Sequence, residues 1–426
     1  MNTVDAVGIN LGTRNAFCAY AGADKNISPV VIPNRWGRTS TPSIVAWDED
    51  WLVGEDAVRL FLRGSGSVWW NVKREAESDF VTSCGNVRYK AQDVLTPLLR
   101  ALREDADVYL GRFVSSCVLA VPECFSPLQR EAMIQAAETA GITNVRVVSE
   151  PVAAAFAFGR EGRFLILDFG AGVADISVVE SNGSAWQILE SLDGAKIGGC
   201  DFDLALAEWL QERLRLDRMS EDDPRWRTLI LEAEAIKIAL SSCLAYDWKP
   251  PSLACREFPV LRIEREELER MTRFSLRRLL NLVRRLWDKH QPECLLLVGG
   301  SSRIPLLREI LEQEIARPER LSLGAEESIA IGAALYAVAG GELLRTESAP
   351  YEKIPGEPLA PGGHMKDLKM RLALIEPSLN PAQKMRLNLM ADKLGNLEND
   401  ASAVEILERV VKDLEAEFIE KATPKE

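Results

Sequence analysis

Apolar runs interrupted by short glycine turns are the main feature of the hydrophobic pattern. Residues 4–20 form one such run around Asn-Leu-Gly-Thr-Arg-Asn, and residues 164–179 repeat the design around Asp-Phe-Gly-Ala-Gly. Each unit predicts a strand, a glycine turn and a second strand. A polar residue, Asn10 or Asp168, stands two positions before the glycine in both units. This weak internal repeat favours two related lobes, each of which presents a hairpin to a shared cleft.

The rest of the first 341 residues alternates between the apolar spacings of strands and of helices. Strands are predicted at 115–121, 145–148 and 294–298. Helices are predicted at 126–140, 150–159, 203–214, 226–244, 265–289, 306–315 and 326–338. Strands that alternate with helices in this way predict an α/β architecture.

The character of the chain changes after this region. Residues 343–365 contain four prolines and a Gly-Gly pair, which is typical of a linker without a core of its own. Residues 366–426 carry an apolar stripe at spacings of three and four, which predicts a short helical tail. The expected organisation is a domain at 1–342 (lobe I about 1–164, lobe II about 165–324, return helix 325–341), the linker at 343–365 and the tail at 366–426.

Composition and charge narrow the possible functions. The chain has 426 residues, of which 47% are hydrophobic and 27% charged, with a net charge of -13. This acidity argues against nucleic acid as a partner, and no stretch approaches the ~18 apolar residues that span a bilayer. With no visible leader at the start, a cytoplasmic protein is expected. Eight cysteines without a Cys-x-x-Cys pair favour buried reduced thiols, and two histidines disfavour a Ser-His-Asp or His-metal enzyme.

The glycine turns carry the strongest chemical signal. Glycine lets backbone amides approach an anion closely, and successive amides in a turn form an anion-binding concavity. Residues 12–15 and 170–173 fit that description, although neither has the Gly-Lys-Ser/Thr of a P-loop. One glycine hairpin is most often only a turn. Two matched hairpins and a third turn at Gly299-Gly300 together favour a polyphosphate ligand.

A series of short motifs makes the prediction more specific. In chain order the motifs lie at 9–15, 38–44, 52–54, 121–130, 149–155, 167–170, 197–203, 237–242, 298–305 and 331–334. Over residues 4–341 this series resembles the nucleotide-binding domain of the DnaK-type, seventy-kilodalton heat-shock chaperones. The resemblance implies a bilobed actin-like ATPase fold, with two duplicated lobes around a cleft that holds ATP or ADP with Mg²⁺.

The resemblance implies roles for the charged residues of the cleft. Lys73 would orient the attacking water and Glu150 would position it. Asp168, Asp175 and Asn10 would hold magnesium through water. Without the resemblance, Lys73 reads as a surface lysine, Glu150 as a charge at a helix terminus and each aspartate as a turn former.

The nucleotide itself is assigned to glycine turns and to one helix face. Glu234, Lys237 and Ser241 lie three and four residues apart, so all three can point at one ligand, which would be the adenosine; a solvated Glu-Lys pair is the alternative. Arg303 would stack on the adenine and Glu326 would lie near it. The other residues implied are Gly12, Thr13, Arg14, Asn15, Gly170, Ala171, Gly172, Val173, Gly198, Gly199, Gly299, Gly300 and Ser302.

Three substitutions depart from the family pattern. Asn10 replaces an aspartate, Val173 a threonine and Ala171 a glycine. Amide-based phosphate binding survives these changes, whereas the ordering of magnesium and water depends on the lost side chains. ATP binding with slow hydrolysis is therefore predicted.

The region after residue 341 is too short for the peptide-binding β-sandwich of the family, although Pro122 and Arg130 keep the spacing of the pair that relays nucleotide state to it. The predicted function is that of a chaperone-like protein, which assists folding or assembly through nucleotide-dependent lobe closure. Its expected partner is a client protein or partner subunit, with a J-domain protein or a nucleotide exchange factor as candidates. A nucleotide-sensing scaffold without turnover is the alternative, and an actin-like filament protein is less favoured.

Overall fold

The computed structural model describes residues 6–22, 28–64, 66–70, 73, 81–84, 87–182, 186–193, 197–251, 257–319 and 324–339. The chain divides into two compact units, Met1–Ile354 and Pro355–Glu426. All described residues belong to the first unit. The linker predicted at 343–365 and the helical tail predicted at 366–426 lie outside the described residues.

The first sheet is built around the N-terminal hairpin. Its strand order is β11–β10–β1–β2–β3, with β4 paired to β2. Strands β1 and β2 are antiparallel, and β10 lies parallel to β1 on the other side. The six strands are β1 (Val7–Leu11), β2 (Asn15–Tyr20), β3 (Val30–Val31), β4 (Thr41–Pro42), β10 (Ser116–Val121) and β11 (Asn144–Ser149).

The second sheet repeats this plan with the second predicted hairpin. Its order is β14–β13–β12–β17, where β12 and β13 are antiparallel and β17 lies parallel to β12. The turns also match, because the amide of Gly12 donates to the Asn15 carbonyl at 3.0 Å and that of Gly170 to the Val173 carbonyl at 3.0 Å. The strands are β12 (Gly162–Phe169), β13 (Ala174–Ser181), β14 (Trp186–Asp193) and β17 (Cys294–Val298).

The helices predicted from apolar spacing are all present. They are α3 (Pro127–Thr139), α4 (Glu150–Phe158), α5 (Gly199–Arg213), α6 (Pro224–Leu240), α7 (Arg265–His290), α8 (Pro305–Glu314) and α9 (Ser328–Val338). Helix α5 begins four residues before the predicted start at Asp203. The Asp201 carboxylate accepts a hydrogen bond from the Gly198 amide at 2.7 Å and so caps an earlier first turn. Helix α6 ends at Leu240 rather than at 244.

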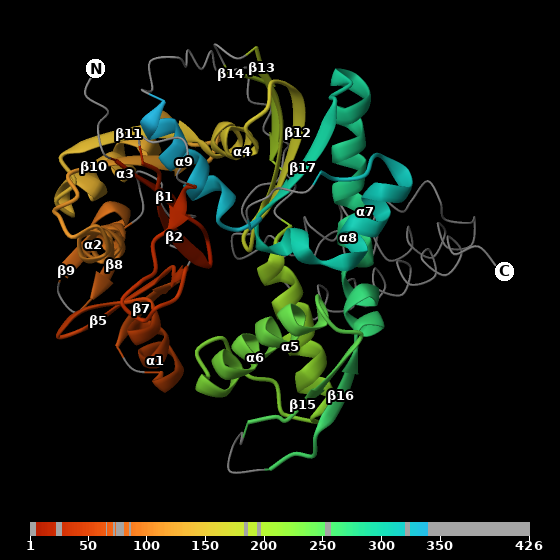
Figure 1. Cartoon of the computed structure of the whole chain (residues 1–426). Coiled ribbons are helices and arrows are strands. Elements are labelled where there is room, and N and C mark those ends of the chain that lie inside the picture. Colours follow the sequence, from red (N-terminus) through yellow and green to blue (C-terminus); the bar gives the residue numbers. More distant parts are fainter. Residues whose placement is uncertain are drawn as a thin grey trace, which may run out of the picture. The chain divides into compact units, whose positions relative to one another are not determined.

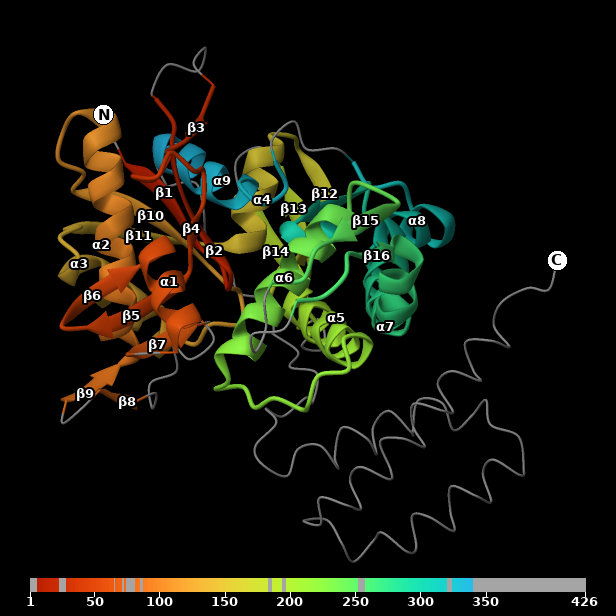
Figure 2. The same ribbon diagram turned by 90° about the horizontal axis from the view of Figure 1, so that it is seen from below.

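Several elements of the structure were not predicted. Strands β5 and β6 form a three-stranded sheet with β7, and the pairs β8–β9 and β15–β16 are two-stranded; Figure 2 shows them from below. The bounds are α1 (Glu55–Arg63), α2 (Ala91–Leu110), β5 (Ile44–Asp48), β6 (Asp50–Val53), β7 (Ser67–Trp70), β8 (Val81–Cys84), β9 (Val87–Lys90), β15 (Ala245–Trp248) and β16 (Leu261–Glu264). Strand β14 of the second sheet and strands β3 and β4 of the first sheet were also missed.

Helix α9 connects the end of the described chain to its beginning. It packs on β1, β2 and β10 of the first sheet and on α4, which in turn contacts β12, β13 and β14 of the second; Figure 1 shows α9, in blue, beside these elements. The contacts are between backbones. A Cβ on Gly8 would lie 2.2 Å from the Ala330 carbonyl oxygen, and one on Gly332 would lie 1.8 Å from that of Ala153.

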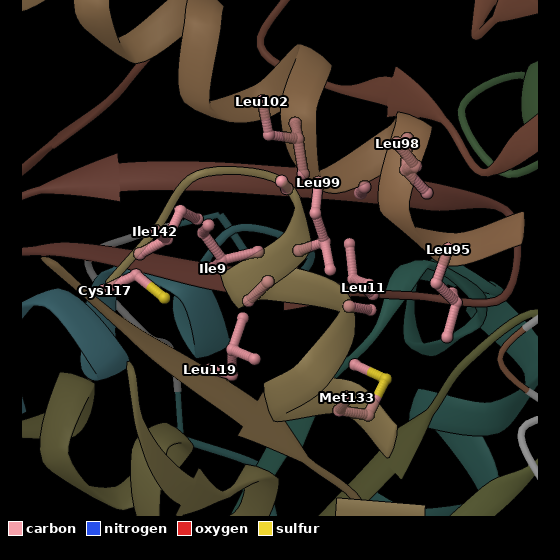
Figure 3. Close-up of a cluster of buried hydrophobic side chains, with 14 of the residues drawn as sticks. Ile9, Leu11, Leu95, Leu98, Leu99, Leu102, Cys117, Leu119, Met133 and Ile142 are labelled. Atoms are coloured by element: carbon pink, nitrogen blue, oxygen red, sulfur yellow. The ribbon is translucent and has the colours of Figure 1, made fainter. Parts of the chain in front are cut away.

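The largest buried cluster fills the space between the first sheet and α2. Ile9 and Leu11 of β1 and Leu119 of β10 pack with Leu95 and Leu99 of α2 (Figure 3). These side chains are at most 1% exposed, and burial of each stabilises the fold by about 1.5–3 kcal/mol. The cluster fixes β1, and therefore the turn that follows β1.

No disulfide bond involves Cys18, Cys117, Cys124, Cys200, Cys243 or Cys294. Cys18 and Cys117 are buried, as predicted, whereas Cys294 is half-buried and Cys124 is exposed. Cys124 lies in a loop after β10, beyond the apolar run that buries Cys117. In the part of the chain that the structure covers, no helix has the length and apolar character of a membrane span.

Candidate functional site

The three glycine segments predicted from separate motifs meet at the second turn. The carbonyl oxygen of Gly170 accepts hydrogen bonds from the Gly199 amide at 3.0 Å and from the Ser301 hydroxyl at 2.9 Å. The neighbouring Ala171 carbonyl accepts the Cys200 amide at 2.7 Å. The second turn, the start of α5 and the short 3-10 helix η1 (Gly300–Arg303) therefore form one backbone cluster.

This cluster leaves no room for a side chain at Gly198 or Gly299. Gly299 has φ +80°, and an added Cβ would lie 2.6 Å from the Asp168 Oδ1 atom. A Cβ on Gly198 would lie 2.4 Å from the Ala171 carbonyl oxygen. Such close approach keeps Cβ atoms away from the backbone of the second turn, which is the condition for amides of a glycine turn to reach a phosphate.

Acidic side chains gather beside the cluster. Asp168 and Asp175 face each other across the β12–β13 pair. Burial, and next the charge of Glu150, raise the pKa of Asp168 to about 7, against the opposing effect of Lys73. Glu150, at the start of α4, is only 5% exposed and pairs with Lys73. A narrow pocket is lined by Glu150, Asp168 and Asp175 together with Pro122, Glu123, Cys124, Pro151, Ile166, Ser177, Ser191 and Leu192.

Asn10 holds the matching position in the first sheet. It is 7% exposed, and its Oδ1 atom has no hydrogen-bond partner within the described residues. An unsatisfied buried oxygen costs about 1–3 kcal/mol, so a bound water or ligand at this point would be favourable. Asn10 pairs with Phe17 where Asp168 pairs with Asp175. The first sheet therefore offers a neutral oxygen where the second offers carboxylates.

The donor set fits a hydrated magnesium ion. Mg²⁺ prefers oxygen ligands, keeps several waters and is commonly held by one or two carboxylates together with substrate phosphates. Asp168 and Asp175 supply such carboxylates. Nowhere in the described ranges do three or more His, Cys, Asp or Glu residues form a group able to hold a metal ion alone. The residues present thus fit a metal that arrives with a phosphate ligand.

The helix face expected to hold adenosine is occupied by internal contacts. The Lys237 Nζ atom lies 2.7 Å from Asp203 Oδ1 and donates to the Gly199 carbonyl at 3.0 Å. The Arg14 guanidinium lies 3.4 Å from Glu234 Oε1 and 3.8 Å from Asp203 Oδ2. The Ser241 hydroxyl donates to the Lys237 carbonyl at 2.9 Å. Glu234, Lys237 and the first glycine turn are thus brought together, with Asp203 between them.

Asp203 is strongly perturbed by this position. Its side chain is 1% exposed. Burial is the largest cause that raises its pKa to about 6, and the charge of Glu234 adds to it. Lys237 and Arg14 act in the opposite direction. Sequence reasoning missed Asp203 as a site residue, although an acid two residues after Asp201, which caps α5, was a visible signal.

The residues expected around the adenine form a second small group. The Arg303 Nε atom lies 3.2 Å from Glu326 Oε1, and Arg303 is about half exposed. The Ser302 hydroxyl donates to the Gly299 carbonyl at 2.6 Å, and the Gly299 amide donates to the Ala325 carbonyl at 2.9 Å. Of the remaining predicted residues, Gly300 begins η1, and the others lie in the two hairpin turns or at their ends: Thr13, Asn15, Gly172 and Val173.

The chain is similar in sequence to known proteins over the region that contains these residues. A family model described as Hsp70 protein matches residues 6–343. Chaperone protein DnaK of Thermosipho melanesiensis is 31% identical over 350 residues, which cover 78% of this chain and 58% of that protein. Chaperone protein DnaK of Mycoplasma mobile is 32% identical over 359 residues, which cover 79% and 59% respectively. The chain therefore spans less than two thirds of the length of these relatives.

Proposed function

This chain belongs to the Hsp70 protein family, and from that membership we propose that residues 6–339 bind ATP and ADP with Mg²⁺ in a chaperone-like protein. The predicted α/β fold, with two sheets of one plan, is the actin-like ATPase domain of that family. The observation that carries the proposal is the backbone cluster in which the second turn, the start of α5 and η1 meet. Backbone amides at such close approach can bind phosphates whatever the neighbouring side chains.

The described residues support a division of labour around the nucleotide. The glycine turns bind the phosphates. Asp168, Asp175 and Asn10 would hold Mg²⁺ through water, and the ion would supply charge neutralisation at the phosphates. Glu234 and Ser241 face the nucleoside. Arg303 and Glu326 flank the base.

The hydrolytic groups are only partly retained. The ion pair of Lys73 with Glu150 lies beside Asp168, and it supports the positioning of a water near the terminal phosphate. The first turn lacks the aspartate at position 10, and the second lacks the threonine hydroxyl at position 173. Removal of one preorganised group from such a site costs about 10²–10³ in rate. Slow turnover is therefore part of the proposal.

Calorimetric titration with ATP and with ADP, both in MgCl₂, tests the binding claim. The wild-type chain should bind both nucleotides, and a ligand at 100 times its Kd should stabilise the fold by about 2.7 kcal/mol. The variant Gly299→Ala should lose nucleotide binding, because its Cβ would lie only 2.6 Å from the Asp168 Oδ1 atom. Gly22→Ala is the matched control, since a Cβ there meets nothing within 4 Å. No heat from the wild type at millimolar nucleotide would refute the proposal.

A scaffold that senses nucleotide without turnover is the second candidate, favoured specifically by Asn10 and Val173. A multiple-turnover phosphate-release assay separates the two candidates, because only the chaperone-like ATPase releases phosphate continuously.

The proposed partners are client proteins, with a J-domain protein or an exchange factor as accessory proteins, in the cytoplasm. Pull-down in ATP and in ADP tests them, since a nucleotide-regulated partner is captured differently in the two states.

A further inference from the structure

Arg14 extends from the first glycine turn into the side-chain network of α5 and α6. Its guanidinium pairs with Glu234 of α6 and with Asp203 of α5, and its Cζ atom lies 4.4 Å from the ring centroid of Trp70 in β7. The side chain is 10% exposed. One buried cation thus joins four elements that are remote from one another in the sequence.

The contact continues as a row of cations and aromatic rings. Trp70 packs edge to face on Phe61 of α1, with 4.6 Å between centroids. Arg227 of α6 lies 5.0 Å from the Phe61 ring and donates to the Phe61 carbonyl at 3.3 Å. Each of these cation–π contacts is a favourable electrostatic interaction between the guanidinium and the ring. The row therefore ties β7 and α1 to α6 at both of its ends.

The guanidinium of Arg14 is paired by charge but is not fully hydrogen-bonded. Its carboxylate partners are 3.4 and 3.8 Å away, which are ion-pair distances at the long end. Its buried Nε atom has no hydrogen bond to any described residue. A buried donor without an acceptor weakens this arrangement of Arg14. The ion pairs and ring contact of Arg14 therefore hold the four elements together, and the long pair with Glu234 can still be replaced by another partner of that carboxylate.

We propose that Arg14 is a latch, in which its guanidinium holds the first glycine turn against Glu234 and Asp203 and leaves Glu234 when nucleotide binds. The second part rests on the proposed function, which places the nucleoside on the α6 face that carries Glu234. A ribose hydroxyl and the Arg14 guanidinium would then compete for the same carboxylate. The latch lowers nucleotide affinity by the free energy needed to break this pair.

The first experiment tests the latch without any nucleotide. A double-mutant cycle of Arg14→Met and Glu234→Gln is measured by thermal unfolding of the full chain. The two losses should be less than additive, because either change alone removes the pair. Arg308→Met with Glu312→Gln is the matched control, an Arg–Glu pair on the surface of α8. Its coupling should be small.

The second experiment measures the competition. Titration calorimetry gives the Kd of AMP, ADP and ATP for wild type and for Arg14→Met. The variant should bind AMP and ADP about three- to fivefold more tightly, as expected when a weak ion pair no longer competes. Arg14→Lys keeps the charge but not the guanidinium fork, and its Kd should fall between the two.

The outcomes are distinct. Additive effects in the nucleotide-free cycle overturn the latch. Weaker binding by Arg14→Met, in proportion to the number of phosphates, also overturns it and makes Arg14 a phosphate ligand. If the double-mutant cycle shows coupling but neither wild type nor any variant binds nucleotide, the proposed function is refuted. Arg14 then remains a bridge between the first turn and α6.

Discussion

Gly332→Ala tests whether α9 and α4 are in backbone contact. Gly332 lies inside α9, where alanine is favoured over glycine by about 1 kcal/mol in helix propensity. The new Cβ would lie 1.8 Å from the Ala153 carbonyl oxygen and 2.6 Å from the Ala153 carbonyl carbon. Both obstructing atoms belong to the α4 backbone, so no side-chain rotation relieves the clash.

The two effects have opposite signs, and packing should win. Cβ atoms essentially never approach another heavy atom within 3.0 Å, so α9 and α4 must separate by more than 1 Å at this point. Overpacking of a dense core costs about 1–3 kcal/mol, and a clash with backbone lies at the upper end. After subtraction of the propensity gain, the free energy of unfolding should fall by about 2 kcal/mol. At an unfolding entropy near 2 cal/mol/K per residue, the melting midpoint of the domain falls by about 3 °C.

Thermal unfolding of the nucleotide-free chain measures this change. Gly22→Ala serves as the control, because its Cβ meets nothing within 4 Å and should leave the midpoint within about 1 °C. A midpoint of Gly332→Ala above that of wild type would mean that helix propensity dominates. The close contact between α9 and α4 would then be refuted.

Three further predictions concern the site and the tail. The double variant Asn10→Asp with Val173→Thr should raise the single-turnover rate of ATP hydrolysis without much tightening of binding; equal rates would show that these departures are harmless. The pKa of Asp203 is raised from 3.8 to about 6, so the folded state binds a proton at this group more readily than the unfolded state does. The free energy of unfolding that Asp203 contributes therefore falls as pH rises from about 4 to about 6. Urea unfolding of Asp203→Asn should therefore show a flatter pH dependence in that window, and an unchanged slope would contradict the assignment. A chain truncated after Gly341 should keep ATP binding and lose any association seen by size exclusion, whereas loss of binding would make the removed residues part of the domain.

The hairpins and their turns could be predicted from the sequence because each is a local feature. An apolar run followed by Gly12 or Gly170 specifies strand and turn within a few residues. Helix α2 was missed because its signals are atypical. It begins after Lys90, a rare N-cap whose amide is bound by Asp93 at 2.8 Å, and it continues past Pro97. Tertiary packing of its leucines on β1 outweighs these local preferences.

The contacts of the site depend on distances that sequence spacing does not contain. Glu234 and Lys237 were predicted to share a helix face, and they do so as neighbours on α6. That both are already engaged, one by Arg14 and the other by Asp203, follows only from how α5, α6 and the first turn pack. The resemblance supplied roles for Lys73 and Glu150 separately, whereas the structure adds that they form an ion pair.

The position of α9 has a consequence for the order in which the domain can form during synthesis. Ala330, Ile331 and Ala334 of α9 complete a buried cluster with Phe17, Ala19 and Ala21 near the start of the chain. At about 5–20 residues per second, the ribosome adds the intervening residues in roughly 15–60 s. Throughout that time β2 lacks the helix that covers it, and its apolar side chains stay accessible. The nascent chain therefore carries these apolar side chains without their cover until its last described helix has been synthesised.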